Sequence, residues 1–344
     1  MDIISHTLCG ALLGGVDTGS RLGPGARLAA TLGALAPDGD LVVALSGWDR
    51  YLHYHEAGTH SVFASPLVAA AVALCLRRTV HRSRFAPLFL AALAGVLLGH
   101  LALDLISGAD IRLFAPIWNV RLAPHLFAMG DVLVIGIMGG GFLLGLRHPK
   151  AGAVCAAAAL ALLILGKQQS QGKATADFGR PSGVDPARQS AGHADAINGS
   201  LFSWTIYERD GDVLRVWNVD ARTGNRSIRF ERRTDPSVGQ QAAAVPAIRD
   251  FIALLHLPVV RIEVIGDRRF VLWSDLRDCS ATNCAVSVGA EIDSAGRLVR
   301  QVIRVGPLNQ ERAIPAIRAA PYSAAALFGD RRRAWIRAFA KTDP

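Results

Sequence analysis

The sequence predicts an α-helical integral membrane domain followed by a soluble α+β domain with a mainly antiparallel sheet. Nearly all long apolar runs fall within residues 1–166, whereas later residues alternate between apolar and polar types around turn sequences. Continuous apolar runs are typical of membrane spans, and alternation is typical of half-buried strands. The 344 residues also leave room for about two domains. We expect the membrane domain over 1–166, a linker over 167–196 and the soluble domain over 197–344.

The membrane domain is predicted to contain about four to six transmembrane segments. Two apolar runs, 3–16 and 26–36, are shorter than the ~20 residues of a full crossing, so they cross with tilt, re-enter the bilayer or pack against neighbours. The run 85–107 is long enough to cross. The other candidate segments are 61–76, 131–146 and 151–166.

Basic residues in short loops indicate which ends of the spans face the cytoplasm. The most basic connections are "RRTVHRSR" at 77–84 and "RHPK" at 147–150. Placing both inside leaves the N-terminus, 37–61, 107–131 and everything after 166 on the outer side. The net charge of +9 is explained by this topology and by contact with anionic membrane lipids, and we expect no nucleic acid partner.

Three strand–turn–strand patterns predict the sheet of the soluble domain. The first, over 201–220, contains an Asp-Gly turn, which is the strongest short hairpin signal. The second and third cover 259–277 and 285–305. A helical period at 242–257 and a basic helix candidate at 322–341 complete the α+β prediction. The pattern does not identify a protein partner of this domain.

The cysteines also bear on the topology. Cys9, Cys75 and Cys155 lie in apolar segments, where free buried thiols are expected. Cys279 and Cys284 lie close together in "CSATNC", and they either form a short disulfide loop or stay reduced. A disulfide would require an oxidising compartment, which agrees with the outer placement of this domain.

The run 85–107 carries an imidazole and a carboxylate, His100 and Asp104, at a spacing of four residues. Side chains four residues apart lie on one face of a helix, so the two point together into the protein. A carboxylate in a bilayer is costly unless it is paired or binds a cation. The pair therefore indicates either a functional site or a hydrogen-bonded clamp between helices, and alone it does not favour one of them.

Three other stretches, 3–16, 36–41 and 53–61, bring ionisable residues to the outer ends of their segments. A solvated turn is the favoured interpretation of "APDGDL" (36–41) taken alone, whereas the density of histidine in "HYHEAGTHS" (53–61) is typical of a metal site. His125 and Asp131 flank the start of a later segment and are candidates by position only. The three stretches contribute His6, Asp38, Asp40, His53, His55, Glu56 and His60.

Histidine nitrogen combined with carboxylate oxygen is the ligand set of zinc or manganese, whereas magnesium prefers oxygen alone. We therefore predict a divalent metal ion, zinc first and manganese second. The candidates exceed four ligands, so either two metals bind or some residues orient the others. The predicted ligands are His6, Asp38, Asp40, His55, His60, His100 and Asp104.

Four stretches together, "DIISHTLCGALLG", "APDGDL", "HEAGTHS" and "GHLALDLIS", resemble the YdjM-like membrane proteins, which are described as metal-dependent hydrolases. The resemblance covers residues 1 to about 135 and implies a metal role for the same seven residues. Glu56 and Ala57 replace an Arg and a Gly that are usual in this family, so an arginine that would hold an anionic substrate is missing. The order of ligands is also distantly similar to zinc phospholipase C and to zinc single-strand nucleases, which favours a phosphoester substrate.

The resemblance implies a protein of the bacterial inner membrane, and the predicted spans and basic loops make it a multi-pass protein with the metal site and the C-terminal domain on the outer, periplasmic side. We predict a metal-dependent hydrolase that acts on a phosphoester or lipid-type small molecule with a metal-activated water. Asp40, Glu56 and His60 are the expected catalytic residues. The alternative is a non-catalytic membrane protein, with a structural polar cluster and a C-terminal domain that binds a partner.

Overall fold

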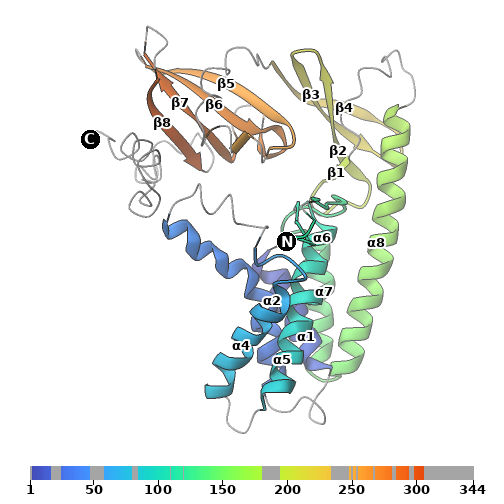
Figure 1. Ribbon diagram of the computed structural model, residues 1–344. Helices are drawn as coiled ribbons and strands as arrows, with labels where there is room; N and C mark the ends of the chain where they lie inside the picture. The colour runs from blue at the N-terminus through green and yellow to red at the C-terminus, as the bar shows by residue number, and fades with distance from the viewer. Residues whose placement is uncertain are drawn as a thin grey trace. The chain divides into compact units, whose positions relative to one another are not determined.

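The computed structural model describes most of the chain, and its elements are labelled in Figure 1. It divides into two compact units: one contains the α-helices, β1 and most of β2, the other contains the second sheet, and β3 and β4 are each divided between the two. The described residues are 2–16, 25–46, 58–79, 84–108, 110–118, 120–179, 194–233, 248, 251–252, 255–265, 268–280, 284–293 and 298–305.

The first helices follow the short apolar runs closely. Helix α1 (Ile3–Gly15) begins at Asp2, whose side chain accepts hydrogen bonds from two backbone N–H groups of the first turn. Helix α2 (Ala26–Leu35) is followed by the 3-10 helix η1 (Pro37–Ser46). Proline lacks an N–H and cannot continue the α2 hydrogen bonds, which explains the change of helix type. Helix α4 covers Ser65–Thr79.

One long helical segment, Phe85–Ile106, is built from three consecutive parts. Helix α5 (Phe85–Ala94) passes into a π-helical stretch, η2 (Gly95–Leu101), and then into α6 (Ala102–Ile106). In η2, the backbone N–H of Ala102 bonds to the carbonyl of Leu97, five residues earlier. Short π-helical stretches within an α-helix are frequent at functional sites. This wider turn includes His100.

The helices α7 (Val132–Gly145) and α8 (Pro149–Gly179) form an antiparallel pair joined by the basic turn. Helix α8 continues 13 residues beyond residue 166, and a strand covers Ala194–Ala196, so the prediction of a linker over 167–196 is wrong for residues 167–179 and 194–196. The extension is polar, and tertiary contacts hold it: Trp204 donates a hydrogen bond to Ser170, and Phe178 packs edge-on against Trp217.

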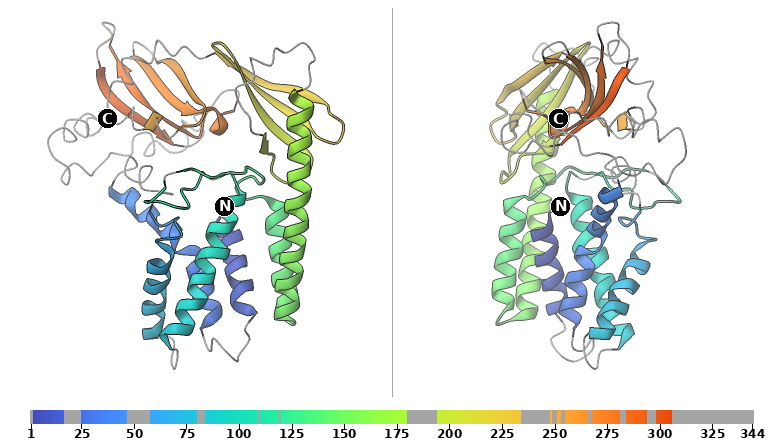
Figure 2. Two further views of the ribbon diagram at one scale, coloured as in Figure 1. Left: turned by 45° about the vertical axis from the view of Figure 1, so that its right-hand side comes forward. Right: turned by 90° about the vertical axis from the view of Figure 1, so that its left-hand side faces the viewer.

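Figures 1 and 2 show the helices running side by side in one bundle. Small residues let their backbones approach closely, because a Cβ at Gly33 would overlap the backbone of Ala92 and one at Gly95 would overlap the carbonyl of Ala30. Close contact through small residues is characteristic of helix association in membranes. Two described helices, Phe85–Ile106 and Pro149–Gly179, are long and apolar enough to cross a membrane, whereas α1, α2 and α7 are apolar but shorter.

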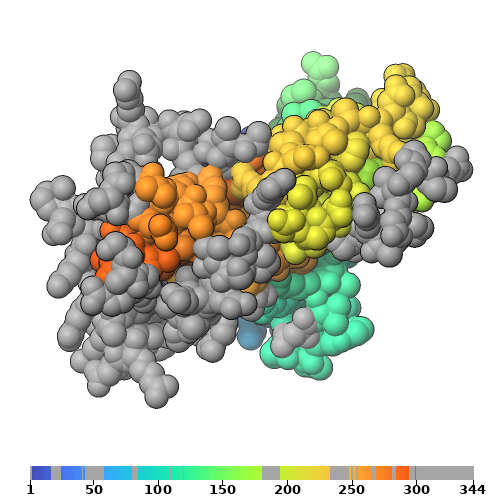
Figure 3. Space-filling view, turned by 90° about the horizontal axis from the view of Figure 1, so that it is seen from above, coloured from blue at the N-terminus to red at the C-terminus, as the bar shows by residue number. Residues whose placement is uncertain are grey.

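The first antiparallel sheet has the order β1-β2-β3-β4. The expected hairpin at 201–220 is confirmed, with Gly211 at φ 62° in the turn between β2 and β3. In the space-filling view of Figure 3, the side chains of β2–β4 form a continuous yellow surface. The strands are β1 (Ala194–Ala196), β2 (Ser203–Asp210), β3 (Val213–Asp220) and β4 (Arg226–Arg233).

The second antiparallel sheet has the order β5-β6-β7-β8 and confirms the two later strand–turn–strand predictions. Both faces of β6 are buried, since Val271 and Leu272 are neighbours in sequence and both are fully buried. Most of the predicted helix 242–257, the turn at 294–297 and the predicted tail helix 322–341 lie outside the described residues. The strands are β5 (Pro258–Ile265), β6 (Arg268–Asp275), β7 (Val286–Ile292) and β8 (Leu298–Val305).

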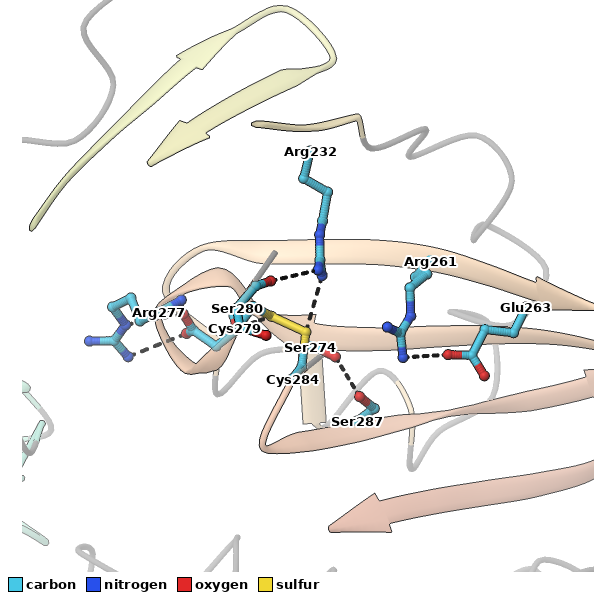
Figure 4. Close-up of a disulfide and its surroundings, with 10 residues drawn as sticks. Arg232, Arg261, Glu263, Ser274, Arg277, Cys279, Ser280, Cys284 and Ser287 are labelled. Atoms are coloured by element: carbon cyan, nitrogen blue, oxygen red, sulfur yellow. Dashed lines mark hydrogen bonds and ion pairs between the residues drawn. A yellow bond between two sulfur atoms is a disulfide. The ribbon is translucent and has the colours of Figure 1, made fainter. Parts of the chain in front are cut away.

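Cys279 and Cys284 form a disulfide, so of the two states that the sequence left open the structure contains the oxidised one. Figure 4 shows the guanidinium of Arg232 reaching this loop, where it donates to Cys284 Sγ at 3.1 Å and to the carbonyl of Ser280 at 3.0 Å. The remaining cysteines are free, and two of them, Cys75 and Cys155, are exposed rather than buried as predicted. The disulfide therefore links the ends of a short loop that follows β6.

Candidate metal centre

Five of the predicted ligands come together within the helical unit although they are up to 98 positions apart in the sequence. Each belongs to a different element or connection. His6 lies in α1, Asp38 in the first turn of η1, and His60 in the segment that precedes α4. His100 lies in the π-helical stretch η2 and Asp104 in α6.

The carboxylate of Asp104 lies between three imidazole rings. Its Oδ2 is 3.1 Å from His100 Nε2 and 3.9 Å from His60 Nε2, and its Oδ1 is 3.4 Å from His6 Nε2. The same ring nitrogen, Nε2, therefore faces Asp104 in all three histidines.

Asp38 supplies a second carboxylate, which faces the same Nε2 atoms of His60 and His100. Its Oδ1 is 3.4 Å from His60 Nε2 and 3.7 Å from His100 Nε2. The centre thus contains two overlapping triads, His6–His100–Asp104 and Asp38–His60–His100, and in each triad the ligand atoms lie within 4.8 Å of one another. His100 belongs to both triads.

The outer nitrogen of each ring is held by the protein. His6 Nδ1 donates to the carbonyl of Gly99 at 2.9 Å, and His100 Nδ1 donates to the carbonyl of Ala34 at 2.7 Å. A carbonyl oxygen can only accept, so the hydrogen of each neutral ring is on Nδ1 and Nε2 carries a lone pair. Metal-ligating histidines are oriented in the same way in proteins.

Burial makes this convergence energetically unfavourable without a positive charge. His100 is completely buried, and its Nε2 has no hydrogen-bond partner among the described residues. A lone pair facing a carboxylate in a buried site is repelled, and an unsatisfied buried polar atom costs about 1–3 kcal/mol. A divalent cation would satisfy the nitrogens and both carboxylates, so the residues present fit a metal ion.

The centre is closed on most sides and open at one carboxylate. The side chains of His6, His60, His100 and Asp104 are at most 4% exposed, whereas that of Asp38 is 42% exposed. Solvent therefore reaches the centre at Asp38.

Asp40 and Thr59 contact His60 on the ring edge opposite Nε2. Asp40 Oδ2 is 3.8 Å from His60 Nδ1, and the hydroxyl of Thr59 lies 3.1 Å from the same nitrogen. Thr59 also lies within hydrogen-bond distance of Asp40 Oδ2 and of the carbonyl of Pro37. Neither triad of described residues includes Asp40, so this predicted ligand occupies a position that supports His60.

Five other candidates came from the sequence, and three of them, His53, His55 and Glu56, lie outside the described residues. His125 Nδ1 is 3.1 Å from Asp195, and Asp131 caps α7 and lies 3.8 Å from the buried Lys167. His125 and Asp131 were candidates by position only, and the structure gives them partners away from the centre.

The sequence did not single out Thr59 or the carbonyls of Ala34 and Gly99. Thr59 stands in the quoted stretch "HEAGTHS", where its position beside His60 was an available signal. The two backbone carbonyls could not be identified from the pattern of side chains, because every residue has a backbone carbonyl.

A family model described as YdjM inner membrane protein matches residues 1–174. No curated protein and no solved structure matches the chain. All five converging residues, together with Asp40 and Thr59, lie within the matched region.

Proposed function

Because this chain belongs to the YdjM inner membrane protein family, we propose that it is an integral-membrane, metal-dependent hydrolase. The proposed substrate is a phosphoester or a lipid-type molecule. The observation that carries the proposal is the convergence of three imidazole Nε2 atoms and two carboxylates, with the Nδ1 atoms of His6 and His100 held by backbone carbonyls.

Zinc is the proposed metal and manganese the second choice, because the donor set combines imidazole nitrogen with carboxylate oxygen. A bound ion of this kind would act as a Lewis acid and lower the pKa of a water ligand to about 7. The residues proposed to hold it are His6, Asp38, His60, His100 and Asp104.

The protein groups have distinct proposed tasks. The buried rings of His6 and His100 are held in place by backbone carbonyls and exclude water from one side of the centre. The half-exposed Asp38 lies at the opening, where it can position an incoming substrate or accept a proton. Asp40 and Thr59 orient His60, and Glu56, outside the described residues, is proposed to add a carboxylate.

Exposed apolar surface supports the proposal of several membrane crossings. Only 11% of the most apolar stretch of α8 is buried, whereas a core helix of a soluble protein would be mostly buried. Large apolar side chains are also exposed on the shorter helices. Such surfaces are costly in water and are stable in lipid. Among those exposed by more than half are Leu67, Leu74, Leu90, Leu98, Leu143, Val154, Leu162 and Leu165.

Charge and redox state support an outer, periplasmic location for the centre. Arg84 precedes the segment Phe85–Ile106, and Asp104 lies near its far end. Similarly, His60 precedes α4, and Arg77 and Arg78 are in its last turn. The basic ends are expected to face the cytoplasm. The Cys279–Cys284 disulfide supports an oxidising compartment for the second unit.

Metal analysis of the gently purified full chain tests the proposed function. We expect near-stoichiometric zinc or manganese in the wild type, its loss in His100→Ala and Asp104→Asn, and its retention in His148→Ala, whose imidazole lies in the exposed turn between α7 and α8. The metal-loaded protein is then assayed on phosphodiesters and phospholipids. Negligible metal in the wild type would contradict the proposal and leave a polar cluster that clamps the helices.

A further inference from the structure

A closed loop follows the segment Phe85–Ile106. The backbone N–H of Leu122 donates to the carbonyl of Ile111 at 3.0 Å, and the two residues pair as an isolated antiparallel bridge. This pairing closes the ten residues between them, which we call the 112–121 loop. Ile111 is completely buried, so the base of the loop is anchored in the helical unit.

The tip of the 112–121 loop exposes large apolar side chains. Ile117 is 77% exposed and Trp118 is 60% exposed. The Trp118 ring stacks on Phe114 with centroids 5.9 Å apart, and the backbone N–H of Trp118 donates to the carbonyl of Phe114 at 3.0 Å. The apolar tip is therefore held in an ordered arrangement that presents it outward.

The charges of the loop are of one sign. Its sequence, "RLFAPIWNVR", contains Arg112 and Arg121 at its two ends and no acidic residue. Tryptophan is enriched where lipid headgroups meet water, and arginine beside a membrane attracts anionic headgroups. An aromatic tip between two arginines matches the chemistry of an anionic lipid surface.

The loop is close both to a candidate span and to the candidate metal centre. It begins six positions after Ile106, the last residue of that span. The backbone N–H of Val62 donates to the carbonyl of Leu113 at 3.0 Å, and Val62 is two positions after His60. One end of the 112–121 loop thus contacts the segment that carries His60, a proposed metal ligand.

We propose that the 112–121 loop inserts Ile117 and Trp118 into the lipid–water interface and that the substrate of the neighbouring centre is an anionic amphiphile resident in the bilayer. The second part of this statement rests on the proposed hydrolase function. The apolar tip contacts the acyl region, and the arginines at the ends of the loop lie at headgroup depth. Binding of a water-soluble phosphoester would not require an apolar loop tip inserted into lipid.

Fluorescence quenching tests the insertion without relying on activity. The full chain is reconstituted in vesicles of phosphatidylglycerol and phosphatidylcholine, with or without bromine on the upper acyl carbons. The chain has six tryptophans, so wild type is compared with Trp118→Phe to isolate one of them. We expect bromine to quench the wild type more than the variant. Equal fractional quenching in both proteins would overturn the insertion.

A substrate comparison tests the selection of amphiphiles. The double variant Ile117→Ser with Trp118→Ser is expected to hydrolyse a bilayer-embedded anionic phospholipid about tenfold more slowly and a soluble phosphodiester at the wild-type rate. Val264→Ser, which removes a similarly exposed side chain from β5, serves as the control and should affect neither substrate.

The outcomes separate the two proposals. Equal loss on both substrates, or no loss on the lipid, overturns the selection of amphiphiles. Loss of a dimer in the double variant, without any difference in quenching, would show that the tip contacts a second copy and would also overturn it. If the metal-loaded wild type hydrolyses neither substrate, the hydrolase function and the substrate assignment both fail, and quenching still decides whether the loop inserts.

Discussion

His6 and His100 stack on each other, with ring centroids 4.1 Å apart and planes inclined by 25°. One ring comes from α1 and the other from η2, and each donates its Nδ1 hydrogen to a backbone carbonyl. Two protonated rings in this arrangement would repel each other. Two neutral rings instead present adjacent Nε2 lone pairs to Asp104, which is the arrangement that a cation would complete.

The stack gives a first prediction. His6→Phe keeps the ring contact and removes both nitrogens, so we expect metal affinity to fall by at least about 10-fold while the helical fold is retained. Isothermal titration of the metal-free protein with zinc, together with circular dichroism, measures both properties. Unchanged affinity would show that His6 only packs against His100.

Thr59 allows a second prediction. Thr59→Val removes the hydroxyl that lies beside Asp40 and His60, and losses of this kind typically weaken metal binding by about 10–100-fold. Thr59→Ser keeps the hydroxyl and should bind metal as the wild type does. Competition with a zinc chelator measures the difference, and equal affinities of the Val and Ser variants would rule out the orienting role.

Close helix packing gives a third prediction. A Cβ at Gly95 would overlap the carbonyl of Ala30, so Gly95→Ala must push α2 and η2 apart. We expect destabilisation of about 1–3 kcal/mol, the usual cost of overpacking, together with weaker metal binding because His100 is in the same π-helical stretch. Thermal unfolding in detergent measures the loss. The control is Gly139→Ala in α7, where nothing lies within 4 Å of the added carbon.

The disulfide leads to a fourth prediction. In intact cells Cys279 and Cys284 should resist alkylation until a reductant is added, because the second unit is proposed to lie in the periplasm. Cys75 is free and exposed, and it serves as the internal positive control once the cells are solubilised. A mobility-shift assay with a maleimide reagent reads the result. Alkylation of both cysteines without reductant would place this unit in a reducing compartment.

Asp275, at the end of β6, gives a pH prediction. Burial raises the pKa of this carboxyl, but Arg277 and the backbone N–H of His256 outweigh it, so the net pKa lies below its usual range. The stabilising contribution is then complete above the unfolded pKa of about 3.9 and is lost as pH falls through the lower folded pKa. The free energy of unfolding is measured with urea between about pH 2 and pH 7. We expect it to fall less at acidic pH in Asp275→Asn than in the wild type. Identical pH profiles would exclude this role.

The fold was largely predictable where local pattern decides the structure. The apolar runs predicted α1, α2, the segment Phe85–Ile106 and α7 to within a few residues, and the Asp-Gly pair predicted the β2–β3 hairpin. The end of α8 was not predictable, because its last turns are polar and are held by residues such as Trp204 and Trp217, far along the chain. The π-helical stretch around His100 likewise has no local signature.

The candidate site was predictable to the extent that ionisable side chains stand out in an apolar sequence. His6, His60, His100, Asp38 and Asp104 were predicted as ligands and do converge. The orientation of the rings was not predictable, since it depends on the carbonyls of Ala34 and Gly99, which are brought into place by helix packing. A sequence pattern can nominate donors, but it cannot show which nitrogen of a ring faces inward.

The length of α8 sets a distance from the membrane surface. Its 31 residues extend about 46 Å, whereas the hydrocarbon core of a bilayer is about 30 Å thick. If the helix crosses from Pro149, about 16 Å remain above the hydrocarbon. Lys173 and Phe178, which contact Ala221 and Trp217, both lie in this remaining part. The helix would then act as a rigid spacer that holds Trp217 and Ala221 at a fixed height, and inserting a single turn would raise that height by about 5 Å.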